Sequence, residues 1–312
     1  MEQKLCELTI EITQKCPNRC MFCSSYAHPN ATVHISAPEI ISVVSQAKQL
    51  GLKRVNISGG EPLCHEAIED VLASIHSEEL AVNIYTTGIR LSNDGMSFPF
   101  TEWGRLAQPD TSLIFNIQST DDVIHDALIR RTGALHQTRQ SILSALKSNV
   151  RVEVHVVPNK QNLFNLEKTV EDLASWGVKQ VSFLRLVPQG YARSFSDKLL
   201  LSNEETEILK NTFFRISQKT YHGMTLRFGI PFSGLVCKAK TCTAGEKKLI
   251  VRYDGKVLPC EAFKDDCLGA YVLGDIRTDS LADILKKAAS SNLLHKLKSQ
   301  VGVETCPAQR LY

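Results

Sequence analysis

Long apolar runs, net charge and internal repeats are all scarce or missing in this 312-residue sequence. No apolar run approaches the roughly 18 residues that a membrane span needs, and the start, Met1-Glu-Gln-Lys, lacks the basic and apolar regions of a secretory signal. Because 36 basic residues are nearly balanced by 33 acidic ones, charge gives no strong signal for nucleic acid or for a membrane surface. These absences indicate an ordinary globular protein, and we expect it to be cytoplasmic.

Cysteine is missing between positions 64 and 237, although the chain has ten cysteines. Three lie together near the amino end, at 16, 20 and 23, and five near the carboxyl end, at 237, 242, 260, 267 and 306. In a reducing compartment such clustering is better explained by metal than by disulfides. Cys6 and Cys64 stand apart, and Cys64 is more typical of a buried thiol.

Strands and helices are expected to alternate over the first two thirds of the chain. The apolar runs that predict strands are residues 6–13, 54–58, 81–86, 111–117, 150–157 and 179–186. The amphipathic runs that predict helices are residues 36–50, 66–77, 136–147 and 163–176. Ser36 and Glu39 have the spacing of a capping box. Strands alternating with helices imply βαβ units and a parallel sheet, with reactive groups at the carboxyl ends of the strands.

The alternation ends near Gln189. A helix is predicted at 203–219, then a hairpin of residues 248–252 and 256–259 about Asp254-Gly255, and a last helix at 280–297. We therefore expect an α/β domain at 1–195, a helical bridge at 196–236 and a small cysteine-rich domain of hairpin plus helix at 237–312.

Three thiols, Cys16, Cys20 and Cys23, follow the first predicted strand at the spacing C-x3-C-x2-C. Three thiolates on one tight loop can hold three corners of a cubane iron–sulfur cluster and leave the fourth iron without a protein ligand. The alternatives are a structural zinc site, which needs four closed ligands, and buried thiols that happen to be close.

The loop resembles the signature of the radical SAM superfamily, C-x3-C-x-aromatic-C, with Phe22 as the aromatic residue. The resemblance covers roughly residues 4–195 and implies an open, partial (β/α)6 TIM-like barrel. It also implies that Cys16, Cys20 and Cys23 hold a 4Fe–4S cluster whose open iron binds S-adenosylmethionine. One electron, from flavodoxin or ferredoxin, would then cleave that cofactor to a 5′-deoxyadenosyl radical that abstracts hydrogen from a substrate.

Gly59-Gly60-Glu61-Pro62 follows the second predicted strand and resembles the superfamily's Gly-Gly-Glu-Pro, which holds the amino group of S-adenosylmethionine. Glycines allow a close approach of the backbone to a ligand, and the carboxylate of Glu61 can accept hydrogen bonds from an ammonium. The alternative is a simple turn.

The resemblance implies further cofactor contacts. Gln118 or Ser119, at the end of the fourth predicted strand, is the candidate for the ribose, and Arg130 or Arg131 for the methionine carboxylate. For each, the alternative is a solvated polar group on a loop. Arg185 lies at the end of the sixth predicted strand, in a stretch similar to Arg-Leu-x-Pro-x-Gly. There it would face an anionic group of cofactor or substrate, or else pair with a core carboxylate.

Cys242, twelve residues, Gly255, four residues and Cys260 fit the pattern C-x9-15-G-x4-C that opens the SPASM and twitch extensions of this superfamily. With Cys242 and Cys260, the predicted ligands of one auxiliary 4Fe–4S cluster are Cys237 and Cys306, and Cys267 competes for either of these two places. The run C-x2-C-x5-C-x3-C of a full SPASM domain is missing, which leaves room for one cluster. A zinc site with four cysteine ligands is the alternative.

The resemblance favours an oxidoreductase-type enzyme that oxidises or cross-links peptide side chains, with the auxiliary cluster accepting an electron from the substrate radical. Because the sequence starts almost at its first strand, we expect no fused leader-peptide-binding domain, which weakens the peptide hypothesis. The alternatives are an enzyme acting on a small sugar, alcohol or nucleotide, and a non-catalytic iron–sulfur or zinc protein. No general base stands out, and His155 on the fifth strand is more typical of packing.

Overall fold

A curved, ten-stranded sheet forms the centre of the computed structural model, which describes residues 4–221, 223–229, 242–265, 269–299, 306 and 308. Its strand order is β12-β11-β10-β1-β2-β3-β6-β7-β8-β9. The strands of this sheet are β1 (Glu7–Thr13), β2 (Arg54–Gly59), β3 (Ala81–Thr86), β6 (Thr111–Asn116), β7 (Arg151–Val156), β8 (Gln180–Phe183), β9 (Thr225–Phe228), β10 (Lys248–Val251), β11 (Lys256–Leu258) and β12 (Gly274–Asp275). A separate hairpin pairs β4 (Ile89–Leu91) with β5 (Ser97–Pro99).

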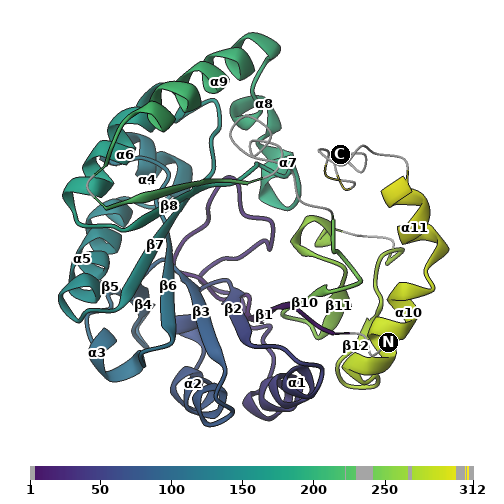
Figure 1. Ribbon diagram of the computed structural model, residues 1–312. Helices are drawn as coiled ribbons and strands as arrows, with labels where there is room; N and C mark the ends of the chain where they lie inside the picture. Colours follow the sequence, from purple (N-terminus) through teal and green to yellow (C-terminus); the bar gives the residue numbers. More distant parts are fainter. Residues whose placement is uncertain are drawn as a thin grey trace.

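Helices follow the outer side of the curved sheet, where α1, α2, α3, α5, α6 and α9 are seen in Figure 1. The helices are α1 (Ala37–Gln49), α2 (Ile68–Ser77), α3 (Trp103–Leu106), α4 (Asp122–Ile129), α5 (Ala134–Lys147), α6 (Leu166–Ser175), α7 (Tyr191–Ser194), α8 (Ser196–Leu199), α9 (Asn203–Gln218), α10 (Leu281–Ala289) and α11 (Asn292–Ser299). The six predicted strands are present as β1, β2, β3, β6, β7 and β8, each parallel to its neighbours. The predicted partial barrel is thus confirmed. None of the helices within the described residues is both long enough and apolar enough to span a membrane.

The two faces of the sheet differ in polarity because successive side chains of a strand point to opposite sides. On β1, Leu8, Ile10 and Ile12 are fully buried members of the main apolar core. The alternate residues Thr9 and Glu11 are also buried, yet they are polar, and each makes a hydrogen bond to a side chain of another segment. The concave side of the sheet is therefore suited to polar chemistry.

Two predicted elements differ from the structure. The helix predicted at 280–297 is two helices, α10 and α11, separated by Ser290 and Ser291. Ser290 donates through Oγ to the backbone carbonyl of Lys286 at 3.2 Å, and serines that compete in this way for backbone groups disfavour helix interiors. In addition, β9 lies inside the predicted helical bridge and pairs parallel with β8.

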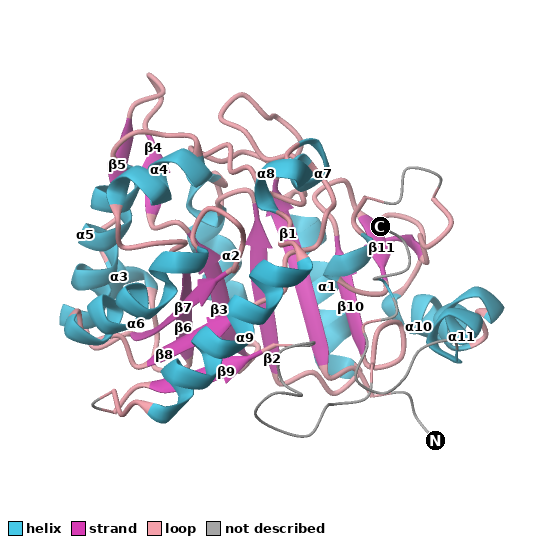
Figure 2. Cartoon of the chain, turned by 90° about the horizontal axis from the view of Figure 1, so that it is seen from above, coloured by secondary structure: helices cyan, strands magenta, loops and turns pink. Residues whose placement is uncertain are grey.

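The C-terminal hairpin continues the barrel sheet. β10 pairs parallel with β1, in the register Glu7↔Lys248 to Ile10↔Val251. Viewed from above, α10 and α11 lie beside this end of the sheet, whereas α5 and α6 lie at the other (Figure 2).

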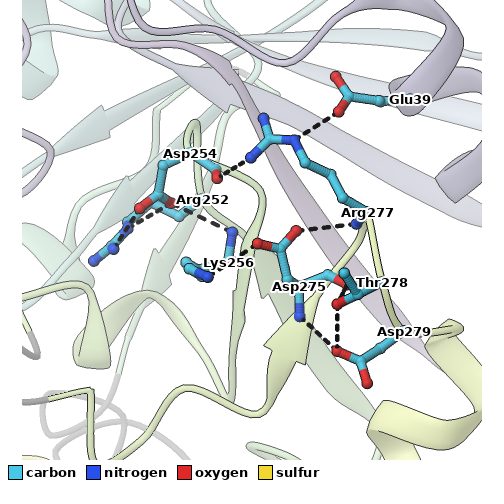
Figure 3. A network of polar contacts seen from close by, with 8 residues as sticks. All are labelled: Glu39, Arg252, Asp254, Lys256, Asp275, Arg277, Thr278 and Asp279. Atoms are coloured by element: carbon cyan, nitrogen blue, oxygen red, sulfur yellow. Dashed lines mark hydrogen bonds and ion pairs between the residues drawn. The ribbon is translucent and has the colours of Figure 1, made fainter.

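Arg277 fastens the hairpin to α1 (Figure 3). Its Nε donates to Glu39 Oε1 at 2.7 Å and its Nη1 to the backbone carbonyl of Asp254 at 2.8 Å. Glu39 also accepts from the backbone N–H and the hydroxyl of Ser36, which confirms the predicted capping box. The bond from the Ser36 hydroxyl is the main reason that the pKa of Glu39 falls to about 2.

Candidate functional site

A cavity of about 520 Å³ opens at the carboxyl ends of the parallel strands. Its wall includes residues of the cysteine loop and of the Gly-Gly turn, namely Cys16, Cys20, Phe22, Cys23, Gly59 and Gly60. Arg185, after β8, and Cys260, from the C-terminal hairpin, line the same cavity. The structure therefore brings four predicted segments, from opposite ends of the chain, to one place.

Backbone hydrogen bonds hold the cysteine loop in position. Arg19 N donates to the carbonyl of Ile129 at 3.2 Å, and Met21 N to that of Leu128 at 2.8 Å, at the end of α4. On the other side, Tyr191 N at the start of α7 donates to the carbonyl of Cys23 at 2.8 Å. The loop is thus clamped between two helices that were not predicted.

The three thiols share an environment that disfavours free thiolates. Burial raises the pKa of Cys16, Cys20 and Cys23, and the thiolate of Cys20 raises that of Cys16 further. Arg131 opposes this effect at Cys20. Its Nη2 is buried and finds no hydrogen-bond partner within the described ranges, so the two N–H groups of that nitrogen remain for an anion beside the thiols.

This donor set fits an iron–sulfur cluster. Soft thiolates are the usual ligands of such clusters, and each iron takes a single thiolate. Within the part of the chain that the structure describes, no three His, Cys, Asp or Glu side chains are placed to hold a single metal ion. The ligands of an iron–sulfur cluster need not meet at one point, because each thiolate binds a different iron atom.

Gly59 and Gly60 are required by the close packing of β2 on the cysteine loop. A Cβ atom on Gly60 would lie 2.3 Å from the carbonyl oxygen of Lys15, and one on Gly59 would lie 2.4 Å from that of Thr13. Gly59 also has φ +132°, which favours glycine. The backbone of both residues faces the cavity.

Glu61 is placed differently from its predicted contact. Its carboxylate accepts from Leu63 N, Thr86 Oγ1, Thr87 N and Thr87 Oγ1, at distances between 2.6 and 3.1 Å. The side chain is fully buried and ties the end of β2 to the end of β3. Pro62 is buried as well and begins a 3-10 turn, Pro62–Cys64. The part of the Gly-Gly-Glu-Pro stretch that lines the cavity is therefore the glycine backbone.

Neither ribose candidate lines the cavity. Gln118 and Ser119 are fully buried. The Oε1 of Gln118 accepts from Val157 N at 3.0 Å, and the hydroxyl of Ser119 donates to Asn165 at 2.6 Å. Asn116, the last residue of β6, does line the cavity. The strand was predicted to run to residue 117. Had its end been placed at Asn116, that residue would have been the candidate, because it is the last inward-facing residue of β6.

The two arginine candidates differ in position. Arg130 is exposed, lies outside the cavity wall, and places its guanidinium over the ring of Phe195 at 5.2 Å. Arg131 points inward, where its Nε donates to Asn18 Oδ1 at 2.7 Å. Burial lowers the pKa of Arg131, while the charges of Asp126, Cys16 and Cys20 act in the opposite direction.

Polar residues that the sequence did not single out complete the wall. They include Tyr85, Thr86, Thr87, Asn116, Lys248 and Glu261. His155 also lines the cavity, and its Nε2 lies 2.9 Å from Glu153 Oε1. Its ring meets that of Tyr85 edge to face. His155 is therefore more than packing, since it presents a fixed imidazole to the cavity.

Three of the carboxyl-terminal cysteines gather around one small apolar cluster. Cys242, Cys260 and Cys306 all pack against the residues Ala244, Ile250, Leu258, Phe263 and Ala308. Burial raises the pKa of Cys260, and the neighbouring Cys306 adds to the shift. The other two candidates, Cys237 and Cys267, lie outside the described residues.

Two family models match the sequence. The one described as "Radical SAM superfamily" matches residues 10–209, and the one described as "Iron-sulfur cluster-binding domain" (SPASM) matches residues 242–308.

Curated relatives share low to moderate identity with the chain. The PqqA peptide cyclase of Granulibacter bethesdensis is 24% identical over 284 residues, which cover 89% of this chain and 72% of the relative. The GTP 3′,8-cyclase of Clostridium perfringens is 30% identical over 236 residues, or 72% of this chain and 67% of the relative.

Solved structures agree on the fold. SuiB of Streptococcus suis, bound to S-adenosylmethionine, superposes with a TM-score of 0.70 at 17% identity, covering 90% of this chain. This chain spans 65% of that SuiB chain, slightly less than two thirds. SuiB has also been solved with its precursor peptide SuiA, and that structure gives a TM-score of 0.73.

Proposed function

Since this chain belongs to the radical SAM superfamily, and is an enzyme with a 4Fe–4S cluster, S-adenosylmethionine and a SPASM iron–sulfur domain, we propose that it oxidises or cross-links side chains of a peptide. One observation carries the proposal: Cys260 of the SPASM domain lines the same cavity as Cys16, Cys20 and Cys23. A substrate in that cavity would adjoin both metal centres. The substrate would then lose a hydrogen atom to the radical at the first cluster and an electron to the auxiliary cluster.

We assign roles to residues by their place in the cavity. Cys16, Cys20 and Cys23 would hold the first cluster, and the backbone of Gly59 and Gly60 would accept the amino group of S-adenosylmethionine. Bound in this way, the cofactor pair supplies a carbon radical that removes hydrogen, while the protein orients the substrate and excludes water. Phe22, Asn116 and Arg185 line the wall. Phe22 and Asn116 would adjoin the adenosine, and Arg185 would face an anionic group of the cofactor or the substrate.

The auxiliary cluster would take Cys242, Cys260 and Cys306 as ligands, with Cys237 completing the set. The support is the packing of the first three against one apolar cluster. A fully ligated cluster has no iron left for substrate, so its role would be to accept an electron.

Flavodoxin or ferredoxin remains our proposed electron donor. The support is the pair of exposed residues Arg19, on the cysteine loop, and Arg130, at the end of the adjoining helix α4. Their guanidinium groups lie 5.9 Å and 5.2 Å from the rings of Tyr191 and Phe195. Such a surface offers positive charge to an acidic partner next to the first cluster.

The peptide substrate is supported by relatives rather than by this chain alone. Two proteins similar to it are a PqqA peptide cyclase and SuiB, which was solved with a precursor peptide. The second candidate is a nucleotide, because a GTP 3′,8-cyclase is also similar at 30% identity.

The first test is anaerobic reconstitution of the wild type and of the triple variant Cys16→Ala, Cys20→Ala, Cys23→Ala. We expect about eight irons in the wild type, about four in the variant, and 5′-deoxyadenosine only from the wild type after reduction with dithionite. Zinc at the carboxyl-terminal cysteines, with about four irons in the wild type, would contradict the electron-accepting role.

The second test separates the substrate classes. Peptides encoded beside the gene and a panel of nucleoside triphosphates are each incubated with reduced enzyme and S-adenosylmethionine. We expect a peptide to lose two mass units and to raise 5′-deoxyadenosine formation. A response to a nucleotide alone would establish the second candidate instead.

A further inference from the structure

Lys264 joins the SPASM domain to β1 through a buried ion pair, and to the two serines after Cys23 through hydrogen bonds. Its Nζ lies 2.6 Å from Oε1 of Glu11 on β1. It also donates to Ser24 Oγ at 3.4 Å and to Ser25 Oγ at 3.3 Å. The lysine side chain is 9% exposed and the glutamate 0%. Removing two charges from water is costly, so a buried pair is weak as a stabilising device, and a functional reason is worth seeking.

The pair lies directly beside a cluster ligand. Ser24 and Ser25 follow Cys23 in the chain, and Ser25 Oγ donates to Glu11 Oε1 at 2.6 Å. Lys264 lines the same cavity as Cys23, whereas Glu11 does not. The positive member of the pair is therefore the one that faces the proposed cluster site.

Other contacts fix Lys264 at this place. Gln189, after β8, donates through Nε2 to the carbonyl of Glu261 at 2.6 Å. Gly190 N donates to Asp265 Oδ2 at 3.2 Å, and Arg193 pairs with the same oxygen at 3.0 Å. Glu261 and Asp265, which flank Lys264 in the chain, are thus both held by the segment from Gln189 to Arg193.

We propose that Lys264 is a positioning residue through which the SPASM domain raises the reduction potential of the cluster held by Cys16, Cys20 and Cys23. The inference rests on the proposed role of these thiols as cluster ligands. Net charge and hydrogen bonding around a cluster set its potential. A fixed ammonium beside Cys23 stabilises the reduced cluster, which carries one more electron from the reductant, and no bond or proton changes hands in that step. Glu11 acts in the opposite direction.

The test is a redox titration of the reconstituted protein, followed by the electron paramagnetic resonance signal that changes when S-adenosylmethionine is added. With Lys264→Met we expect the ratio of reduced to oxidised cluster, at the wild-type midpoint, to fall about tenfold, which equals about 59 mV for one electron. Glu11→Gln should shift the midpoint in the opposite direction. Lys264→Arg should stay close to the wild type, because the charge is kept.

The signs of the shifts separate an electrostatic role from a structural one. Damage to the loop would shift the midpoint potentials of Lys264→Met and Glu11→Gln in the same direction. That result would overturn the inference, and so would an unchanged midpoint in both variants. If Lys264→Met fails to fold, the double variant Lys264→Met, Glu11→Gln removes both charges together and should titrate near the wild type. If the wild type forms 5′-deoxyadenosine but neither variant has a shifted midpoint potential, the inference fails and the proposed function stands. A wild type without a signal that responds to S-adenosylmethionine overturns both.

Discussion

Glu153 makes the stability of the barrel depend on pH. Burial opposes its ionisation, but hydrogen bonds from His155 and Ser182, together with the charge of His155, outweigh it and bring the pKa of Glu153 from 4.5 to about 2. Because the folded pKa is the lower one, the carboxylate stabilises the fold above about pH 4.5. That contribution is lost as the pH falls from 4.5 towards 2.

We expect the unfolding free energy of the metal-free wild type to drop by up to about 3 kcal/mol through this group between pH 5.5 and pH 2.5. Glu153→Gln should lose less over the same range, since its side chain does not titrate. Urea unfolding at both pH values measures the difference. Glu204→Gln, at an exposed position on α9, is the matched control and should follow the wild type.

Glu61→Gln tests whether the glutamate acts on the cofactor or on the fold. The carboxylate accepts from Leu63, Thr86 and Thr87, and an amide NH2 cannot accept from these donors. We expect a loss of about 1–3 kcal/mol in stability, together with weaker binding of S-adenosylmethionine because the glycines shift. Calorimetry would measure both quantities. Unchanged stability with lost binding would instead indicate a direct contact between carboxylate and cofactor.

Among the helices and strands, apolar periodicity predicted the bounds correctly where one face of the segment packs on the core. The run Ala81–Thr86 alternates inward and outward residues and is a strand with the predicted bounds. Short elements whose formation depends on tertiary contacts were missed. β9, Thr225–Phe228, is half-exposed along its length and is stabilised by pairing with β8. α4 is capped by Asp121, which a search for apolar periodicity does not detect.

Gly190, at the start of α7, controls how closely that helix approaches the cysteine loop. It has φ +62°, and a Cβ atom there would lie 2.4 Å from the carbonyl oxygen of Cys23. We expect Gly190→Ala to displace the loop and to lower the reconstituted iron content by about the four irons of one cluster. Iron analysis measures the loss.

Gly133→Ala is the matched control for this substitution. Gly133 has φ +74°, and nothing lies within 4 Å of the point that a Cβ atom would occupy there. The variant should lose about 1–2 kcal/mol of stability to backbone strain and keep its iron. Equal iron loss in both variants would show that strain, rather than the clash with Cys23, is responsible.

For the whole molecule, the grouping of the three cysteines at the cavity was predictable and the rest of the cavity wall was not. Cys16, Cys20 and Cys23 lie in one short loop, so their spacing alone indicates shared chemistry. Asn116 and Lys248 come from different strands, and their place in the cavity depends on where each strand ends and on the pairing of β10 with β1. Neither the strand end nor the pairing can be predicted from the residues next to Asn116 or Lys248 in the chain.

The exposed surface formed by Arg19 of the cysteine loop and Arg130 at the end of α4 should matter only for a protein reductant. With Arg19→Glu and Arg130→Glu together, we expect cofactor cleavage driven by flavodoxin to slow at least tenfold at low salt, an effect of charge on association. Cleavage driven by dithionite should be unchanged, because neither residue lines the cavity. The control pair Lys53→Glu and Arg151→Glu changes the same charge at the amino ends of β2 and β7, and should leave both rates unaltered.

The parallel pairing of β10 with β1 also has a consequence for the order of synthesis. Glu7 and Lys248, which meet across this pair, are 241 positions apart. At roughly 5–20 residues per second, a ribosome needs roughly 12–48 seconds between them. During that interval the edge of β1 that later pairs with β10 is an open template for other strands, and the buried Glu11 lacks its partner Lys264.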